Sequence, residues 1–458
     1  MKKRFLLWDN PRQAIFTLMA VLLLLGGINV FSASLYDNGL SYLLRYYLCA
    51  VLGFVGIYFI RKIGYKRLLN KRFLWICYCI VLVMLVVVHF WGAANKGATR
   101  WIYIGSFSIQ PSEIAKLVLI MLSARFLGNA MKLGEKISLY KGECLLVTMA
   151  TGIAAFGVLV QPDLGTAAII AALVMGMFIV AGLPARWITT IVGVGAVGAV
   201  LLSISSEYRL QRLHVWFDPW LDPQGKGYQM VQSLLAIGSG GLTGTNWGHG
   251  AAKFAYLPEA HTDFAFAVFC QENGFFGALI LLLVFCLLGV AFYKITISTR
   301  DQKGFLLAAG VTFLIIGQAF ANMAMVCGIF PVIGVPLIFI SYGGSSMIIS
   351  MAAIGLLLSV YDEEEKQQLL DAEPPEKRRN DLRVVGSRRW QQEALLPFLD
   401  SKRRFTALCI CMVVIVARCV FTFNLAAGSA GRQAQAADEI TADGRVYTRH
   451  SARTHCGP

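Results

Sequence analysis

The sequence is poor in charged residues and lacks several familiar catalytic signatures. Asp, Glu, Lys and Arg make up 15% of its 458 residues and hydrophobic residues 57%, whereas soluble globular chains carry about 25% charged residues. This balance excludes a soluble globular fold for most of the chain. No Walker phosphate loop, Gly-x-Ser-x-Gly elbow or His-Glu-x-x-His motif occurs, which excludes the sites that those motifs form.

Metal-ligand spacing and a nucleic-acid footprint are also absent. The 11 cysteines lie mostly inside apolar runs, as small core residues do, so we predict neither a disulfide framework nor a zinc site. The formal charge of +15 is spread over short Lys/Arg stretches between apolar runs, a pattern typical of cytoplasmic loops that face anionic lipid. The expected partner is therefore a membrane, and nucleic acid is excluded.

Long apolar runs are what the sequence has in abundance. At about 20 residues per span, they predict an all-α integral membrane protein with a ten-helix bundle. The predicted spans are 13–34, 40–60, 73–93, 111–128, 144–160, 165–183, 186–204, 263–293, 304–327 and 343–361. Basic residues crowd loops 61–72, 132–141 and 294–303 on the side of the basic N-terminus, so we expect both ends of this bundle in the cytoplasm.

Two segments predicted on the outer face are informative. The large extracellular loop 205–262 is far longer than a helix connection needs and is rich in Trp, Gly, Tyr and His, which favours an ordered, functional loop. The segment 328–342 is apolar but broken by Pro331, Gly334 and Pro336. Such backbone exists at membrane depth only when it is buried in protein or lines a wet cavity. We therefore predict a re-entrant segment that forms the floor of a cavity.

Composition divides the chain into four parts. Residues 1–361 form the membrane domain, and the charge runs that follow predict a cytoplasmic linker over 362–404. A further apolar run behind a basic cluster predicts one additional transmembrane helix at 405–424, which crosses outward and leaves 425–458 as an external tail.

Ionisable residues gather just before the predicted span 263–293, in the segment Leu257-Pro-Glu-Ala-His-Thr-Asp-Phe264. Asp263 has a plain structural interpretation, because a carboxylate at a helix N-terminus caps free backbone N–H groups. Glu259 and His261 lie alongside, and ionisable groups in membrane segments often mark functional sites. The segment therefore supports two interpretations, a helix cap and a catalytic or binding site.

A second group comprises Arg100, Glu113 and Lys116. Glu113 and Lys116 lie three residues apart on a predicted helix, where they can simply pair with each other. A lysine about a turn inside the lipid is nevertheless costly unless it faces a partner or an anion. Arg100 beside Trp101 fits either an interfacial anchor or an anion ligand.

One pair of basic residues has both a structural and a functional interpretation, and one acidic residue has a structural one. Arg209 and Arg212 would share one face of a helix, at a spacing that suits a phosphate clamp or a surface salt-bridge pair. Asp163 lies in a short turn between two predicted spans, where it is expected to cap the second one.

Taken together, the motifs resemble, in order, those of the SEDS family of FtsW, RodA and SpoVE. The motifs are Arg100-Trp-Ile, Gln110-Pro-Ser-Glu113, Lys116, Gln161-Pro-Asp-Leu-Gly165, Asp218-Pro-Trp220, Gly227-Tyr-Gln229, Leu257–Phe264 and Ile340-Ser-Tyr-Gly-Gly-Ser345. The resemblance covers residues 13–361, and the first-helix segment Val30-Phe-Ser-Ala-Ser34 is similar to the FtsW branch. It implies a ten-helix peptidoglycan glycosyltransferase that polymerises lipid II for cell division or cell shape.

The resemblance also implies roles for the matching residues. Asp263 is implied as the catalytic residue, with Arg100 and Lys116 as ligands of the pyrophosphate-linked substrate. The other residues that we expect around the substrate are Arg209, Arg212, Glu113, Glu259, His261 and Ser341. One departure is Cys270-Gln-Glu272, where the family commonly has Gly-Glu-Glu, so Gln271 replaces an acid and receives no role.

The implied chemistry needs a base and an anion clamp. The acceptor sugar's 4-hydroxyl loses a proton as it attacks the anomeric carbon, and the lipid pyrophosphate leaves with added negative charge. No cofactor is predicted with certainty, although a divalent cation, Mg²⁺ or Mn²⁺, could stabilise the leaving group. The implied partners are lipid II, the undecaprenyl-pyrophosphate-linked glycan, a class B penicillin-binding protein and other divisome or elongasome proteins at the bacterial cytoplasmic membrane.

Rival interpretations stay open. Ten helices around a polar cavity also describe a lipid II flippase or transporter, although charged motifs that crowd one face favour chemistry there, and a non-catalytic scaffold is a third class. The basic cluster Lys402-Arg-Arg404 and the run 405–424 resemble the start of a single-pass class B penicillin-binding protein. The tail is therefore either a partner anchor fused in cis, held at high effective concentration, or an accessory helix packed on the bundle.

Overall fold

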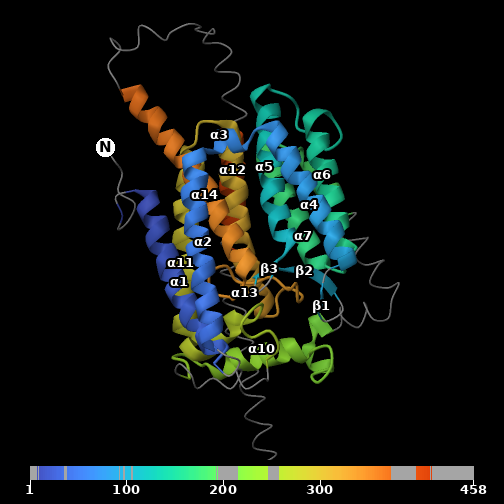
Figure 1. The fold of residues 1–458 in the computed structure, drawn as a ribbon, viewed down its shortest axis with the longest axis vertical. Helices are drawn as coiled ribbons and strands as arrows, with labels where there is room; N and C mark the ends of the chain where they lie inside the picture. Colours follow the sequence, from blue (N-terminus) through green and yellow to red (C-terminus); the bar gives the residue numbers. More distant parts are fainter. Residues whose placement is uncertain are drawn as a thin grey trace, which may run out of the picture.

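The computed structural model describes residues 8, 10–35, 39–91, 93–95, 98–104, 107–191, 193, 215–245, 257–372, 399–412 and 414. Long helices run side by side along the longest axis of the molecule, and the shorter helix α10 (Tyr228–Ser239) lies across one end of them (Figure 1). The other helices are α1 (Pro11–Ala33), α2 (Gly39–Ile63), α3 (Tyr65–Leu68), α4 (Lys71–Trp91), α5 (Pro111–Lys132), α6 (Gly142–Leu159), α7 (Leu164–Ala181), η1 (Pro219–Leu221), α11 (Ala265–Ser298), α12 (Gln302–Thr312), η3 (Phe313–Gly317), α13 (Gln318–Val326) and α14 (Gly344–Ala372).

Within the described residues, nine helices are long and apolar enough to cross a membrane, with α12, η3 and α13 forming one continuous span. They correspond to nine of the predicted spans, and the prediction of an all-α membrane protein is confirmed. The predicted span 186–204 lies mostly outside the described residues. Local sequence explains the helix starts: at α1, Asn10 Oδ1 accepts a hydrogen bond from Gln13 N at 2.9 Å and Pro11 fits the first turn.

Burial divides the helices into a central and a peripheral group. The α5 and α14 helices and the span from α12 to α13 are mostly buried, whereas α2, α4 and α6 expose many large apolar side chains. Lipid tolerates such an apolar surface, so the second group forms a lipid-facing layer. The central group also carries buried polar side chains, which lipid would not solvate. These include Glu113, Lys116, Gln318 and Asn322.

A small sheet forms in the connection between the predicted spans 73–93 and 111–128. Three strands pair antiparallel in the order β1-β2-β3, and Ile102 lies opposite Ile109. The strands are β1 (Ala93–Asn95), β2 (Ala98–Ile104) and β3 (Phe107–Ile109). The aromatic and β-branched residues of this segment favour extended backbone. The strands are too short to be recognised from apolar runs of the length that spans a membrane.

Helix α14 continues past residue 361, where the cytoplasmic linker was expected to begin, and reaches Ala372. Its acidic last turns bind basic residues of α1, α2, α3 and the connection before α12. The ion pairs are Arg12–Asp362 (2.9 Å), Arg61–Asp362 (2.7 Å), Lys66–Glu363 (2.5 Å) and Arg300–Asp371 (2.7 Å). The helix persists because its carboxylates find partners there that a solvated linker would lack.

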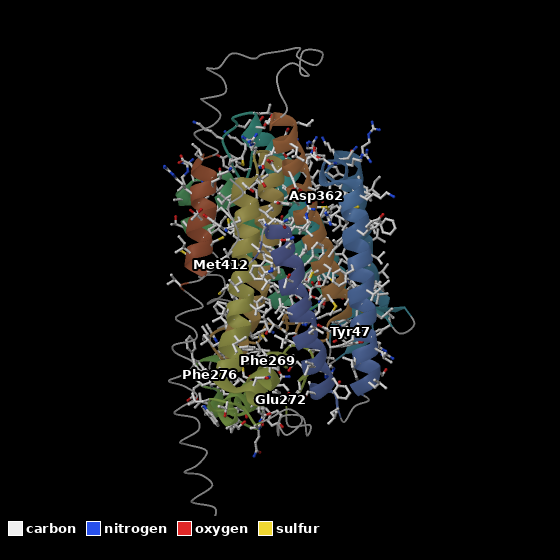
Figure 2. The ribbon with its side chains drawn as sticks, turned by 90° about the vertical axis from the view of Figure 1, so that its left-hand side faces the viewer. Tyr47, Phe269, Glu272, Phe276, Asp362 and Met412 are labelled. Carbon is white, nitrogen blue, oxygen red and sulfur yellow. The ribbon has the colours of Figure 1, made fainter. Side chains whose placement is uncertain are left out.

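Another helix covers residues 399–412 and lies beside α11, with Met412 near its far end (Figure 2). It starts six residues before the predicted span 405–424. Most of that span falls outside the described residues, so its crossing of the membrane stays a prediction, as do the linker and the external tail 425–458.

Candidate active site

Between α13 and α14, residues 327–343 form neither helix nor strand, and we call them the re-entrant segment. Protein groups satisfy its backbone: the Tyr46 hydroxyl donates to the Phe339 carbonyl, and Ser341 Oγ accepts a hydrogen bond from Leu337 N at 2.9 Å. Ser341, predicted to bind substrate, is buried and thus helps to shape this turn. Irregular backbone at membrane depth is stable under these conditions, which agrees with the sequence prediction.

Two amide side chains one turn apart on α13 hold the re-entrant segment. Asn322 Nδ2 donates to the Val335 carbonyl at 2.6 Å and to the Asp263 carbonyl at 2.8 Å. Gln318 Nε2 lies 3.5 Å from the Pro336 carbonyl. Sequence reasoning assigned no role to either amide. The available signal was their occurrence in an otherwise apolar helix, since such residues in membrane helices usually bond to neighbouring elements.

Asp263 lies in the turn before α11 and is partly exposed. Its carboxylate faces the re-entrant segment: a Cβ built on Gly334 would lie 3.5 Å from Asp263 Oδ2. Gly334 also has a φ of 72°, in the left-handed region that favours glycine. Helix α11 begins at Ala265 with Phe264 at the N-cap position. Asp263 is therefore displaced from the position of a capping residue, which weakens the helix-cap interpretation.

Lys116 is buried, with 1% of its surface exposed. Its Nζ lies 2.7 Å from Glu113 Oε1 and donates to Gln318 Oε1 at 2.8 Å. The structure thus contains the Glu113–Lys116 pair that the spacing allowed, and it adds a partner from α13. A buried ammonium needs such partners because an uncompensated charge in the interior costs several kcal/mol. Since Gln318 also approaches Pro336, Lys116 supports one side of the re-entrant segment.

Arg100 extends from β2 to the turn before α7. Its Nη2 donates to the Pro162 carbonyl at 2.7 Å, and its Nε lies 3.6 Å from Asp163 Oδ2. Asp163 caps α7 as predicted, accepting hydrogen bonds from Thr166 N at 3.2 Å and Thr166 Oγ1 at 2.8 Å. The Arg100 side chain remains 30% exposed. The guanidinium is therefore held by the turn before α7, and part of the side chain stays exposed to solvent.

Glu259 and His261 lie in the turn with Asp263. Glu259 adopts a positive φ of 58° and its Oε2 accepts a hydrogen bond from Thr262 Oγ1 at 2.8 Å. The His261 carbonyl accepts from Tyr342 N at 2.8 Å, and its ring lies 5.1 Å from that of Tyr42. These contacts fasten the turn to the re-entrant segment and to α2.

The described site groups therefore converge on residues 333–336. Gly165, beside the turn that binds Arg100, packs against the backbone of this stretch so closely that no Cβ fits. The same stretch faces Asp263 directly and meets Lys116 through Gln318. Arg209 and Arg212 lie outside the described residues, so their predicted clamp is not part of this geometry.

Across the described part of the chain, no group of three or more His, Cys, Asp or Glu side chains could hold a metal ion. The divalent cation left open by the sequence gains no ligand set there. The chemistry available to the described residues is a half-buried carboxylate, a partly exposed arginine and a buried, paired ammonium.

Comparison with known proteins identifies the family to which the chain belongs. The family model of FtsW, RodA and SpoVE, described as "Cell cycle protein", matches residues 12–366. This chain belongs to the FtsW/RodA/SpoVE family. The match ends before the helix at 399–412, which is therefore an addition to the family's region.

Relatives within the FtsW/RodA/SpoVE family support an enzymatic role. Stage V sporulation protein E of Bacillus subtilis is 35% identical over 77% of this chain and 97% of its own length. A probable peptidoglycan glycosyltransferase FtsW of Geobacter sp. is 36% identical over 76% of this chain and 94% of its own. The names of these relatives confirm the predicted class, a peptidoglycan glycosyltransferase on the FtsW side of the family.

A solved structure gives the same fold. It is described as "Structural coordination of polymerization and crosslinking by a peptidoglycan synthase complex" and superposes with a TM-score of 0.63 at 29% identity, covering 76% of this chain and 97% of its own. The FtsW/RodA/SpoVE bundle of this chain is thus a multi-pass membrane protein.

Proposed function

We propose that this chain polymerises lipid II into glycan strands at the outer face of a bacterial cytoplasmic membrane. The observation that supports this most is the convergence of Asp263, the Arg100 turn and the Lys116 pair on residues 333–336. Family relatives named as peptidoglycan glycosyltransferases support the reaction class. The described residues supply what sugar transfer requires, a base and a positive charge for the leaving group.

The orientation follows from where the charges lie. Asp362 is near one end of the bundle and Glu272 near the other (Figure 2). Arg12 at the start of α1, Arg61 and Arg300 share the end of Asp362, which the positive-inside bias assigns to the cytoplasm. The N-terminus is then cytoplasmic, and the turn with Asp263 faces the outer side, where lipid-linked sugars are polymerised.

Asp263 is the proposed general base. Its carboxylate is partly exposed and flanked by Gly334, so an acceptor hydroxyl can approach it while the protein fixes its position. The proton of the 4-hydroxyl passes to the carboxylate as the oxygen attacks the anomeric carbon, whose bond to the lipid pyrophosphate breaks. Asn322 donates to the Asp263 carbonyl and to the Val335 carbonyl, and so fixes the backbone of the base relative to the re-entrant segment.

The positive charges take different roles. Arg100 is partly exposed and is the proposed ligand of the departing pyrophosphate. Lys116 is buried and fully engaged with Glu113 and Gln318, which supports a positioning role for the pair. Arg209 and Arg212 remain predicted members of the same clamp, and Glu259 and His261 predicted contacts of the sugar.

The division of charge also bears on the flippase alternative. A transporter must open the substrate path to both faces in turn. The cytoplasmic end is closed by ion pairs between α14 and the helices around it, among them Arg12–Asp362 and Arg61–Asp362. This arrangement supports chemistry at one face.

A polymerisation assay with purified lipid II tests the proposal. We expect the detergent-purified chain to form glycan strands and Asp263→Asn, folded to the same extent by gel filtration, to form none. If the wild-type chain instead moves labelled lipid II across vesicle membranes without linking two sugars, the flippase interpretation is correct and the proposal is wrong.

The proposed partner is a class B penicillin-binding protein, which would crosslink the strands. The solved relative is described as a complex that coordinates polymerization and crosslinking, which supports a partner of this kind. Divisome or elongasome proteins are proposed as further partners, on the sequence resemblance alone.

A further inference from the structure

The helix at 399–412 lies outside the family match yet packs tightly on the bundle. Phe405 is fully buried, with 0% of its surface exposed. Its ring stacks on Tyr293 of α11 at 5.9 Å between centroids and 10° between planes. It also lies 6.1 Å from Phe305 of α12 and 5.6 Å from Phe313 of η3. An aromatic cluster drawn from three elements thus encloses the side chain.

The contact with α11 continues along the helix in regular steps. Lys402 Nζ donates to the Ile297 carbonyl at 2.7 Å, and the Thr406 and Tyr293 hydroxyls lie 3.0 Å apart. Four residues forward on one helix correspond to four residues back on the other, so the two helices pack antiparallel, turn against turn. Farther along the helix, Met412 packs against Gly317 of η3: its Cε would lie 3.5 Å from a Cβ built on that glycine.

The basic residues before the apolar run have separate roles. Lys402 binds a carbonyl in the last turn of α11, and Arg404 Nη2 would lie 3.0 Å from a Cβ on Gly182, the left-handed C-cap of α7. Helix C-termini carry free carbonyls and the negative end of the helix dipole, which attract cations. The side chain of Arg403, by contrast, is 85% exposed. Lys402 and Arg404 are therefore docking contacts, and Arg403 is a solvated charge.

The docked helix also completes an apolar cavity. Leu408 and Met412 line a space of about 360 Å³ together with residues of α7, α11, η3 and α13. Gln318, the amide that binds Lys116, lies on the wall of the same space. The added helix thus forms part of the wall of an apolar cavity that Gln318 also lines.

We infer that the face formed by α11, α12 and η3 is a docking site for a membrane helix, and that this chain fills it in cis with its own residues 399–412. The aromatic cluster, the repeating contact with α11 and the two helix-end contacts carry the inference. It concerns an interface and stands independently of the reaction. A separate single-pass partner, or the same helix from a second copy, would meet a site already occupied by a segment tethered to it.

Cleavage of the tether tests this directly. A specific protease site is inserted within residues 373–398 of the full chain, and two versions with different tags at both ends are co-expressed and purified in detergent. After cleavage, we expect the C-terminal piece to stay with the bundle of its own version. Loss of the piece from the wild-type bundle on cleavage, or its equal recovery with both bundles, overturns docking in cis.

Substitutions test the contacts. The retained fraction should fall at least about tenfold for Phe405→Ala, because truncating a buried aromatic is among the costliest core changes, and should also fall for the double variant Lys402→Ala, Arg404→Ala. Arg403→Ala is the matched control and should retain the piece. If the bundle retains the same fraction of the C-terminal piece in all three variants, these contacts do not hold the helix.

A crosslink in intact membranes covers the case in which Phe405→Ala misfolds. Tyr293→Cys with Thr406→Cys should form an intrachain crosslink with a short bismaleimide, whereas Tyr293→Cys with Arg403→Cys should not. The same low yield from both pairs would overturn the inference without any cleavage or core truncation.

Discussion

At the end of the bundle where α1 begins, partly exposed charged side chains bind one another, whereas around the re-entrant segment buried polar side chains bind one another and backbone carbonyls. The pairs of Asp362 and Glu363 with basic residues are partly exposed, and exposed ion pairs contribute about 0–1 kcal/mol each. Asn322 and Lys116 are buried, so breaking their contacts leaves desolvated groups unpaired. Similar residue types thus fasten helices at one end and hold the re-entrant segment at the other.

The largest expected effect is at Asp263. Asp263→Asn should lower strand synthesis by about 10²–10⁴-fold, since an amide of the same size cannot accept the proton. The initial rate of polymerisation with purified lipid II measures this. At the other end, Asp362→Asn makes the same chemical change and should leave the rate within a few-fold of wild type. Comparable losses in both variants would erase the contrast between the ends.

Arg100 sharpens the comparison because its side chain is paired with Asp163 and is still partly exposed. Arg100→Ala should reduce the rate by about 10²-fold if its guanidinium stabilises the leaving pyrophosphate. Arg100→Lys keeps the charge but loses the fork that reaches Pro162 and Asp163, so it should retain intermediate activity. Equal rates for the three proteins would assign Arg100 to membrane anchoring.

Lys116 tests whether a buried ion pair does more than stabilise the fold. Lys116→Ala leaves Glu113 buried without its ion-pair partner and should destabilise the protein by about 3–5 kcal/mol. The double variant Glu113→Gln, Lys116→Met removes both charges and should recover thermal stability in detergent, because replacing both partners of a buried pair is often neutral. We expect its polymerisation rate to stay low, since the contact with Gln318 is lost. Full recovery of both properties would reduce the pair to a structural element.

Asn322 tests the support of the re-entrant segment itself. Asn322→Ala removes hydrogen bonds to the carbonyls of Asp263 and Val335 and should slow polymerisation about tenfold, as expected for the loss of one or two buried hydrogen bonds. Asn273→Ala is the matched control, because its amide donates to Phe269 within its own helix. If Asn273→Ala polymerises more slowly than Asn322→Ala, Asn322 does not have the supporting role assigned to it.

The smallest effect is expected at the end of the bundle that carries Asp362 and Glu363. Lys66→Ala removes the pair with Glu363, in which both side chains are substantially exposed, and should change the free energy of unfolding by about 0–1 kcal/mol. The change should shrink further in high salt, which screens exposed charges. Thermal melting at two salt concentrations measures it. A loss as large as that of Lys116→Ala would mean that the two ends do not differ.

Local features of the sequence determined the membrane class, nine confirmed spans, the cap of α7 at Asp163 and the position of Asp263 beside a helix start. Each depends on residues within one or two turns, where apolar length, capping chemistry and proline placement act directly. The sequence did not reveal the extended strands between the spans 73–93 and 111–128, or the helical continuation of α14 beyond residue 361. Short strands and acidic helix ends depend on the elements that pair with them.

The tertiary structure alone decided which residues meet. Lys116 and Gln318 are 202 positions apart, and hydropathy makes both stand out as polar residues in apolar spans without saying that they are partners. The same holds for Asp263 with Gly334, and for Lys402 with the end of α11. Packing of a bundle fixes the rotation and neighbours of each helix through contacts between distant segments, and a pattern read along one helix carries no information on that choice.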